Sequence, residues 1–232
     1  MNMDPSRSVV ITAIRSAIPY LRLFQGRTFV IKAGGDVVAD RASTKVLMEQ
    51  VGILHQLGIR VVVVHGGGSQ ATQLATNLGL PTQMVAGRRV TDARTREVAT
   101  MVLNGSVNTE IVATCREVGL PAIGLSGVDA GLIRAHKRAP KEVPGHGVVD
   151  YGFVGDIQSV DTKVLERLLA DGFVPIVSPL SADEHGQILN INADVVAASL
   201  GKALKAEKLI LVTGVAGILR DVTDPSSLIS YT

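Results

Sequence analysis

Short apolar runs alternate along the chain with longer segments whose apolar residues recur at helical spacing. Val61 to Val64 are four β-branched residues in a row, which is the pattern of a strand buried on both faces of a parallel sheet. The same reading predicts strands over 27–31, 61–64, 121–125, 173–177 and 208–213, and helices over 43–57, 71–79, 92–103, 108–118, 161–171 and 194–204. Regular alternation of strands and helices predicts an α/β fold with a central, mainly parallel sheet.

Two of the predicted strands run directly into glycine turns. The strand at 61–64 is followed by His65 and the triplet Gly66 to Gly68, and Ser69 is placed to cap the next helix. Glycines let the backbone approach a ligand closely, and the free N–H groups at a helix start attract anions. A purely structural tight turn remains open for this triplet, because it matches neither the dinucleotide fingerprint nor the P-loop.

The first strand ends in a lysine and a second glycine turn, formed by Lys32, Gly34 and Gly35. Adjacent parallel strands would bring this turn and the triplet at 66–68 to the same edge of the sheet, where open α/β sheets bind ligands. A solvated lysine beside an ordinary turn is the alternative. The pairing of two such turns favours a binding site for an anion.

Further polar side chains stand at helix starts. Arg88 and Arg89 precede the helix at 92–103, and arginine is well shaped to hold a carboxylate with two hydrogen bonds. Asn190, Asn192 and Asp194 open the helix at 194–204, where they either cap it or bind a polar ligand. Short alternating pieces within 131–160 predict hairpins, which we interpret as a lid over the site.

Composition limits the classes of function. The 232 residues are 46% apolar and 19% charged, with a net charge of +2 and no basic cluster, so a nucleic-acid partner is disfavoured. No apolar run approaches the roughly 18 residues of a membrane span. The single cysteine, Cys115, excludes an internal disulfide and fits a cytoplasmic setting, and the five histidines show no metal-ligand spacing, so no metal site is predicted.

The candidate residues are a lysine, an arginine, glycine turns, asparagines and an aspartate, all at strand ends or helix starts. This set suits transfer of a phosphoryl group, in which positioning and charge neutralisation do most of the work and no protein nucleophile is required.

Seven ordered motifs resemble those of the amino acid kinase family, in its branch that acts on N-acetylglutamate. The resemblance spans roughly residues 19–232 and implies a three-layer αβα sandwich. The order and spacing of the motifs are more specific than any one of them. The motifs lie at 32–35, 65–68, 87–92, 124–127, 152–155, 190–194 and 211–219.

The resemblance implies transfer of the γ-phosphoryl group of ATP, with Mg²⁺, to the side-chain carboxylate of N-acetyl-L-glutamate, in arginine biosynthesis. Lys32 would be catalytic and Asp194 would orient it. The implied substrate-binding residues are Gly67, Gly68, Arg89, Asn190 and Asn192, and the implied phosphate- or ATP-binding residues are Gly34, Gly35, Gly66, Thr213 and Gly214.

The resemblance also implies how the chain is divided. Residues 1–25 would form an N-terminal helix for oligomerisation, 26–180 the substrate lobe and 181–232 the start of the nucleotide lobe. The helix around Pro19 resembles that of arginine-inhibited members, which implies L-arginine as an effector and a homo-oligomer, either a dimer or a hexamer. Because the family continues beyond the last motif, we expect the C-terminal part of the fold to be incomplete.

Two departures keep a second function open. Gly214 stands where many members of the family carry an aspartate, and a second phosphate-binding lysine is missing from the sequence. A kinase-fold domain can instead serve as the arginine-sensing and assembly module of an acetylglutamate synthase. Relatives that phosphorylate aspartate, glutamate, carbamate or an aminoadipate derivative are the other enzymatic alternatives. The motif at 87–92 favours the acetylated substrate.

Overall fold

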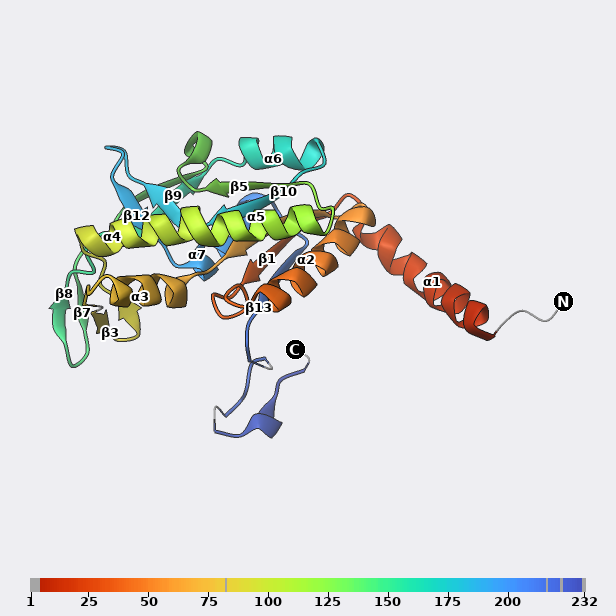
Figure 1. The fold of residues 1–232 in the computed structure, drawn as a ribbon, viewed down its shortest axis with the longest axis horizontal. Coiled ribbons are helices and arrows are strands. Elements are labelled where there is room, and N and C mark those ends of the chain that lie inside the picture. The colour runs from red at the N-terminus through yellow and green to blue at the C-terminus, as the bar shows by residue number, and fades with distance from the viewer. Residues whose placement is uncertain (1–4, 82, 216, 222, 231–232) are drawn as a thin grey trace.

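A five-stranded, all-parallel sheet forms the centre of the computed structural model, which describes residues 5–81, 83–215, 217–221 and 223–230. The strand order is β13-β1-β2-β10-β5 (Figure 1). In register, Val30 lies between Val62 on β2 and Leu209 on β13. The five strands are β1 (Thr28–Ala33), β2 (Arg60–His65), β5 (Ala122–Ser126), β10 (Val174–Ser178) and β13 (Lys208–Val212).

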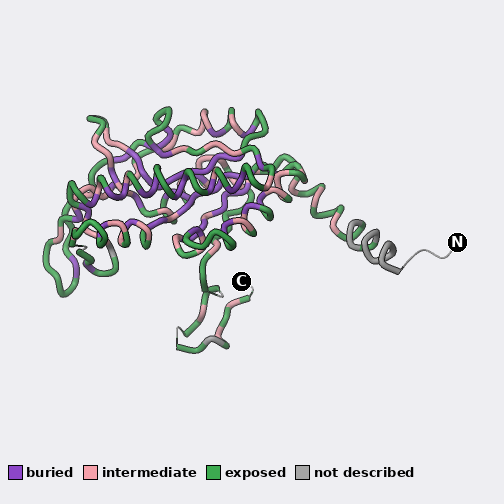
Figure 2. Tube along the Cα trace, in the orientation of Figure 1, coloured by how far each residue is buried: buried purple, intermediate pink, exposed green. Residues whose placement is uncertain are grey.

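Helices cover both faces of this sheet, as the three-layer prediction requires. Alternate residues of β2 point to opposite faces: Val61 and Val63 pack with α2 to α5, whereas Val62 and Val64 pack with α6 and α7. Burial is therefore greatest in the middle layer (Figure 2). The helices are α1 (Pro5–Phe24), α2 (Arg41–Gln56), α3 (Gly68–Asn77), α4 (Ala93–Thr100), α5 (Asn108–Glu117), α6 (Lys163–Ala170) and α7 (Ala193–Ala203).

The region that the sequence predicted as hairpins supplies β6 and β9, two of the four strands of a second sheet in the order β12-β11-β6-β9. Two small hairpins lie beside it, β3 with β4 and β7 with β8, and Val85, Val143 and Tyr151 form a shared apolar cluster between them. The sequence did not predict the β3–β4 hairpin. The bounds are β3 (Met84–Val85), β4 (Arg88–Arg89), β6 (Ile133–Lys137), β7 (Lys141–Val143), β8 (Gly147–Val149), β9 (Gly155–Val160), β11 (Leu180–Ala182) and β12 (Ile188–Asn190), with short 3₁₀ turns η2 (Asp129–Gly131) and η3 (Pro225–Ser227).

Two local predictions were wrong. The chain does not break at Gly105, because a π-helical stretch, η1 (Met101–Val107), joins α4 to α5 in one continuous helix. Ser69 does not cap α3: this helix begins at Gly68, and Gly67 occupies the cap position without a side-chain hydrogen bond. Gly67 is needed there for space, because a Cβ on it would lie 2.6 Å from Cδ2 of Leu103.

The N-terminal helix α1 is attached to the sandwich through its own C-terminal end. There Phe24 packs edge-on against Phe29 of β1, with ring centroids 5.4 Å apart. The rest of α1 projects away from the other helices (Figure 1). In the part of the chain that the structure describes, no helix is long and apolar enough to cross a membrane.

Glycines in the sheet and in the helices should respond oppositely to alanine. A Cβ at Gly124 of β5 would lie 2.0 Å from Oδ1 of the buried Asn108, whereas a Cβ at Gly52 of α2 would meet no atom within 4 Å. Gly124→Ala should lower the free energy of unfolding by about 1–3 kcal/mol through overpacking. Gly52→Ala should raise it by about 0.5–1 kcal/mol because alanine favours the helix.

Urea unfolding of the two variants and the parent chain measures both effects. Equal stabilities for Gly124→Ala and the parent chain would contradict the packing described around Asn108.

Candidate active site

One cavity of about 600 Å³ lies at the carboxyl ends of β1 and β2. The two strands pair in parallel, so their glycine turns meet at this edge. The start of α7 and the β3–β4 hairpin complete the walls. The predicted site residues that line the cavity are Lys32, Gly35, Gly66, Gly67, Gly68, Arg89, Asn190, Asn192 and Asp194.

Lys32 and Asp194 form an ion pair inside the cavity, with 3.0 Å between Nζ and Oδ1. Lys32 is the penultimate residue of β1, and Asp194 lies in the first turn of α7, which packs on β1. The side chain of Lys32 is 13% exposed and that of Asp194 is 53% exposed. Because solvent reaches Asp194 and screens the pair, it contributes little to stability, but it holds the Lys32 ammonium group in place.

Asn192 acts as the cap that the sequence left as one alternative. Its Oδ1 accepts hydrogen bonds from the N–H groups of Asp194, at 2.7 Å, and of Val195, at 3.3 Å. The cap fixes the start of α7 and with it the position of Asp194. Asn190 also lines the cavity and is anchored by its backbone, whose N–H donates to the Phe153 carbonyl.

The two glycine turns touch. A Cβ on Gly35 would lie 3.1 Å from the Gly67 nitrogen and 3.4 Å from the Gly68 nitrogen, so the contact tolerates a side chain poorly. Among the described residues, no hydrogen bond from the N–H groups of Gly35, Gly67 or Gly68 is found. Neighbouring unpaired N–H groups form an anion-binding concavity, here reinforced by the positive end of α3.

The N–H groups of Gly34 and Gly66 are already used inside the fold. Gly34 donates to the Val212 carbonyl and Gly66 donates to the Ala33 carbonyl, both at 2.9 Å. These two glycines therefore bring the turns together but have no N–H to offer a ligand.

Arg89 reaches the cavity from β4. Its Nη2 donates to the Gly68 carbonyl at 2.7 Å and to the hydroxyl of Thr72, whereas Nη1 is buried with no partner among the described residues. Burial lowers the pKa of Arg89, but an arginine stays protonated near neutral pH. A buried guanidinium with an unused donor is suited to bind a carboxylate.

Sequence reasoning missed a second arginine in the cavity wall. Arg138 donates through Nε and Nη2 to the carboxylate of Asp156, with a shortest contact of 2.6 Å. This pairing raises the pKa of Arg138. Tyr151 and Val154 line the cavity beside it. No motif marks these residues, because the antiparallel pairing of β6 with β9 places Arg138, just after β6, beside Asp156 of β9.

Three predicted residues do not line the cavity: Gly34, Thr213 and Gly214. The N–H of Gly214 donates to Oδ2 of Asp36 at 2.7 Å, and Asp36 fills the space beside Gly34 as well. Thr213 forms hydrogen bonds of 3.3 Å with the backbone of Val215. Their assigned role in binding ATP stays a prediction.

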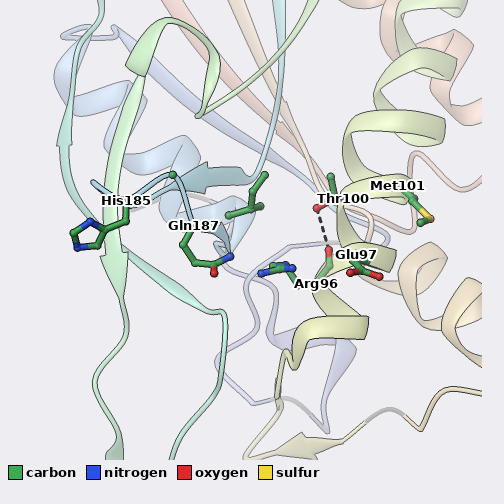
Figure 3. A pocket seen from close by; sticks show the side chains of 8 residues that line it. Arg96, Glu97, Thr100, Met101, His185 and Gln187 are labelled. Atoms are coloured by element: carbon green, nitrogen blue, oxygen red, sulfur yellow. Dashed lines mark hydrogen bonds between the residues drawn. The ribbon is translucent and has the colours of Figure 1, made fainter.

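A second hollow, of about 700 Å³, lies between α4 and the turn that joins β11 to β12 (Figure 3). Thr100 donates to the carbonyl of Arg96 at 3.0 Å, and the guanidinium of Arg96 stacks 4.6 Å from the ring centroid of Phe153. Figure 3 shows Glu97 beside Arg96, so the charges at this wall are mixed. None of the predicted site residues lies here.

The sequence of the chain matches a known protein family and several curated relatives. The family model described as the amino acid kinase family matches residues 27–231. The chain is 47% identical to the acetylglutamate kinase of Myxococcus xanthus over 224 residues, which are 94% of this chain and 73% of that protein. It is 44% identical to the acetylglutamate kinase of Symbiobacterium thermophilum, over 98% of this chain and 78% of that protein.

A solved structure of N-acetylglutamate synthase from Neisseria gonorrhoeae, complexed with coenzyme A and N-acetyl-glutamate, superimposes with a TM-score of 0.77. The identity is 28%, and the match covers 91% of this chain but 47% of the synthase. The chain thus spans about half of the synthase and about three quarters of the two kinases. From the family match, the identities and the fold, we conclude that the chain belongs to the amino acid kinase family.

Proposed function

We propose that the chain is an acetylglutamate kinase, which transfers the γ-phosphoryl group of ATP to the side-chain carboxylate of N-acetyl-L-glutamate. Relatives of that name, more than 40% identical over nearly the whole chain, support this proposal. The observation that carries it is the gathering of Lys32, the Gly35–Gly67–Gly68 N–H groups and Arg89 in one cavity.

Each of these groups has a part in the proposed reaction. The guanidinium of Arg89 would hold the α-carboxylate through its unused Nη1, leaving the side-chain carboxylate to face the glycine turns. An oxygen of that carboxylate forms a bond to the γ-phosphorus while the bond from phosphorus to the bridging oxygen of ADP breaks. Lys32 and the N–H groups would stabilise the negative charge on the phosphoryl oxygens during transfer.

Asp194 would act through Lys32. Its carboxylate holds the ammonium group 3.0 Å away and keeps it at the end of β1. Transfer is direct from ATP to the substrate, so no side chain needs to form a covalent intermediate. Asn190, which also lines the cavity, would contribute a polar contact to the substrate.

Magnesium would arrive with the nucleotide. In the residues that the structure describes, no three histidine, cysteine or acidic side chains gather in a way that holds a metal ion. We therefore treat Mg²⁺ as part of the MgATP substrate, in which it neutralises charge on the phosphates.

The proposal also covers the cellular location of the enzyme, its oligomeric state and its effector. Burial raises the pKa of the Cys115 thiol to about 12, so this cysteine is unreactive near neutral pH. A free cysteine fits a reducing compartment, so the enzyme would be cytoplasmic. The projecting helix α1 supports a homo-oligomer in which α1 would pack on a neighbouring subunit. Inhibition by L-arginine rests on the resemblance of the helix around Pro19 to that of arginine-inhibited members of the family.

The fold likeness to N-acetylglutamate synthase keeps the second candidate, an arginine-sensing and assembly module. Trapping acyl phosphate with hydroxylamine separates the two. The chain should form hydroxamate from MgATP and N-acetylglutamate but not from free glutamate. A folded chain that binds arginine or N-acetylglutamate but gives no hydroxamate would favour the sensor.

Removing the lysine should greatly slow turnover without unfolding the chain. We expect Lys32→Ala to lower kcat by about 100- to 1,000-fold, because one oriented donor to the transferred group is lost. Lys163→Ala is the matched control, since the Lys163 side chain is 88% exposed and pairs with Asp161 far from the cavity. Hydroxamate formation measures both. Equal kcat values for the two variants would contradict the role of Lys32.

Changing the arginine to lysine should affect one substrate only. Arg89→Lys keeps the charge but loses the planar pair of donors, so we expect KM for N-acetylglutamate to rise about 10- to 100-fold. KM for ATP should stay unchanged. Arg41→Lys is the control, because the Arg41 side chain is 84% exposed on α2. An increase in KM for ATP alone would show that Arg89 belongs to the nucleotide side.

A further inference from the structure

His65 is a buried polar residue at the end of β2, directly before the glycine turn of the proposed active site. Its ring has a partner at each nitrogen. Nδ1 lies 2.8 Å from the Gly66 carbonyl oxygen, and Nε2 lies 3.0 Å from Nδ2 of Asn108. The ring does not itself line the cavity, although Gly66 and Gly67 do.

The two neighbours fix the tautomer of the ring. A carbonyl oxygen can only accept, so Nδ1 carries the proton and donates to Gly66. The amide nitrogen of Asn108 also donates to the Ile176 carbonyl at 3.0 Å, so it is a donor to Nε2 as well. Burial lowers the pKa of His65 to about 4, which keeps the imidazole neutral near pH 7. The hydrogen bonds therefore have a single consistent direction, from Asn108 through His65 to Gly66.

The bond to Gly66 sets the direction of the next N–H group. In a planar trans peptide the carbonyl and the following N–H point to opposite sides. With the Gly66 oxygen held by the ring, the Gly67 N–H points away from His65. The Gly67 nitrogen lies beside Gly35, and Leu103 blocks the other side of Gly67, where a Cβ would come within 2.6 Å of Cδ2.

The π-helical stretch η1 positions both Leu103, which packs on Gly67, and Asn108, which holds the His65 ring. It carries Leu103 against Gly67 and leads directly into Asn108, the first residue of α5. A regular helix would shift both side chains, because a π turn inserts an extra residue into the hydrogen-bond ladder.

We propose that His65 is a positioning residue for phosphoryl transfer: its Nδ1–H holds the Gly66 carbonyl so that the Gly67 N–H faces the transferred group, and Asn108 holds the ring. This inference rests on the proposed function and adds to it a residue that does not touch the substrate.

Two substitutions of His65 separate positioning from packing. The amide nitrogen of asparagine takes the place of Nδ1, so His65→Asn keeps the donor to Gly66 and loses the contact with Asn108. Glutamine reaches as far as Nε2, so His65→Gln keeps the contact with Asn108 and loses the donor. Both remove the ring from the core, and urea unfolding establishes the conditions under which each variant is folded.

We expect His65→Asn to keep kcat within about threefold of the parent chain, and His65→Gln to lower kcat by about 10- to 100-fold, as a misdirected group does. KM for N-acetylglutamate should be unchanged in both variants. Equal losses of kcat in the two folded variants, or a fully active His65→Gln, would overturn the proposal.

Binding of pyrophosphate, followed by calorimetry, keeps this test separate from the proposed function. The affinities for pyrophosphate should follow the order of the kcat values. His65→Asn should bind about as tightly as the parent chain, and His65→Gln at least about tenfold more weakly, because one hydrogen bond to an anion is lost. If the parent chain forms no acyl phosphate, the proposed function fails and these affinities decide the role of His65. Equal affinities of the two variants for pyrophosphate, or no binding by the parent chain, would overturn the positioning role of His65.

Discussion

The close approach of two backbone turns is the constraint on which the site depends. Gly35 and the pair Gly67 and Gly68 meet so tightly that a Cβ on Gly35 would lie 3.1 Å from the Gly67 nitrogen. The approach follows from the parallel pairing of β1 with β2, which ends both strands at the same edge. Glycine is required because the unpaired N–H groups must come together without side chains between them.

The charged groups are arranged around that contact by the sheet and its helices. Lys32 comes from β1 itself, and Asp194 comes from the capped start of α7, which packs on the same strand. Arg89 is held from the other side by the Gly68 carbonyl, so its position also depends on the glycine turn. One local geometry therefore sets the N–H groups and orients the cations beside them.

Much of this arrangement could be predicted from the sequence. The four valines of β2 and the two glycine turns predicted a parallel sheet with an anion site at its edge, and the structure confirms the sheet and brings the turns together. The resemblance to the amino acid kinase family is confirmed by the comparisons. These features could be predicted because each leaves a local signal in the sequence: a run of β-branched residues, a glycine turn after a strand, or a short motif.

Features that depend on tertiary contacts could not be predicted. The π-helical stretch reads in sequence as a break at Gly105, but packing of Leu103 on Gly67 and of Asn108 on His65 favours a continuous helix. Arg138 enters the cavity through strand pairing with no motif of its own. Asp36 binds the Gly214 N–H, a long-range contact that no local pattern indicates.

A crystal structure with N-acetylglutamate and a non-hydrolysable ATP analogue tests the central claim most directly. Oxygens of the terminal phosphoryl group should lie about 2.7–3.2 Å from the N–H nitrogens of Gly35, Gly67 and Gly68. Lys32 should contact the same group, and the α-carboxylate should lie on Arg89. A nucleotide whose phosphates lie elsewhere, with the glycine N–H groups still unpaired, would contradict the account.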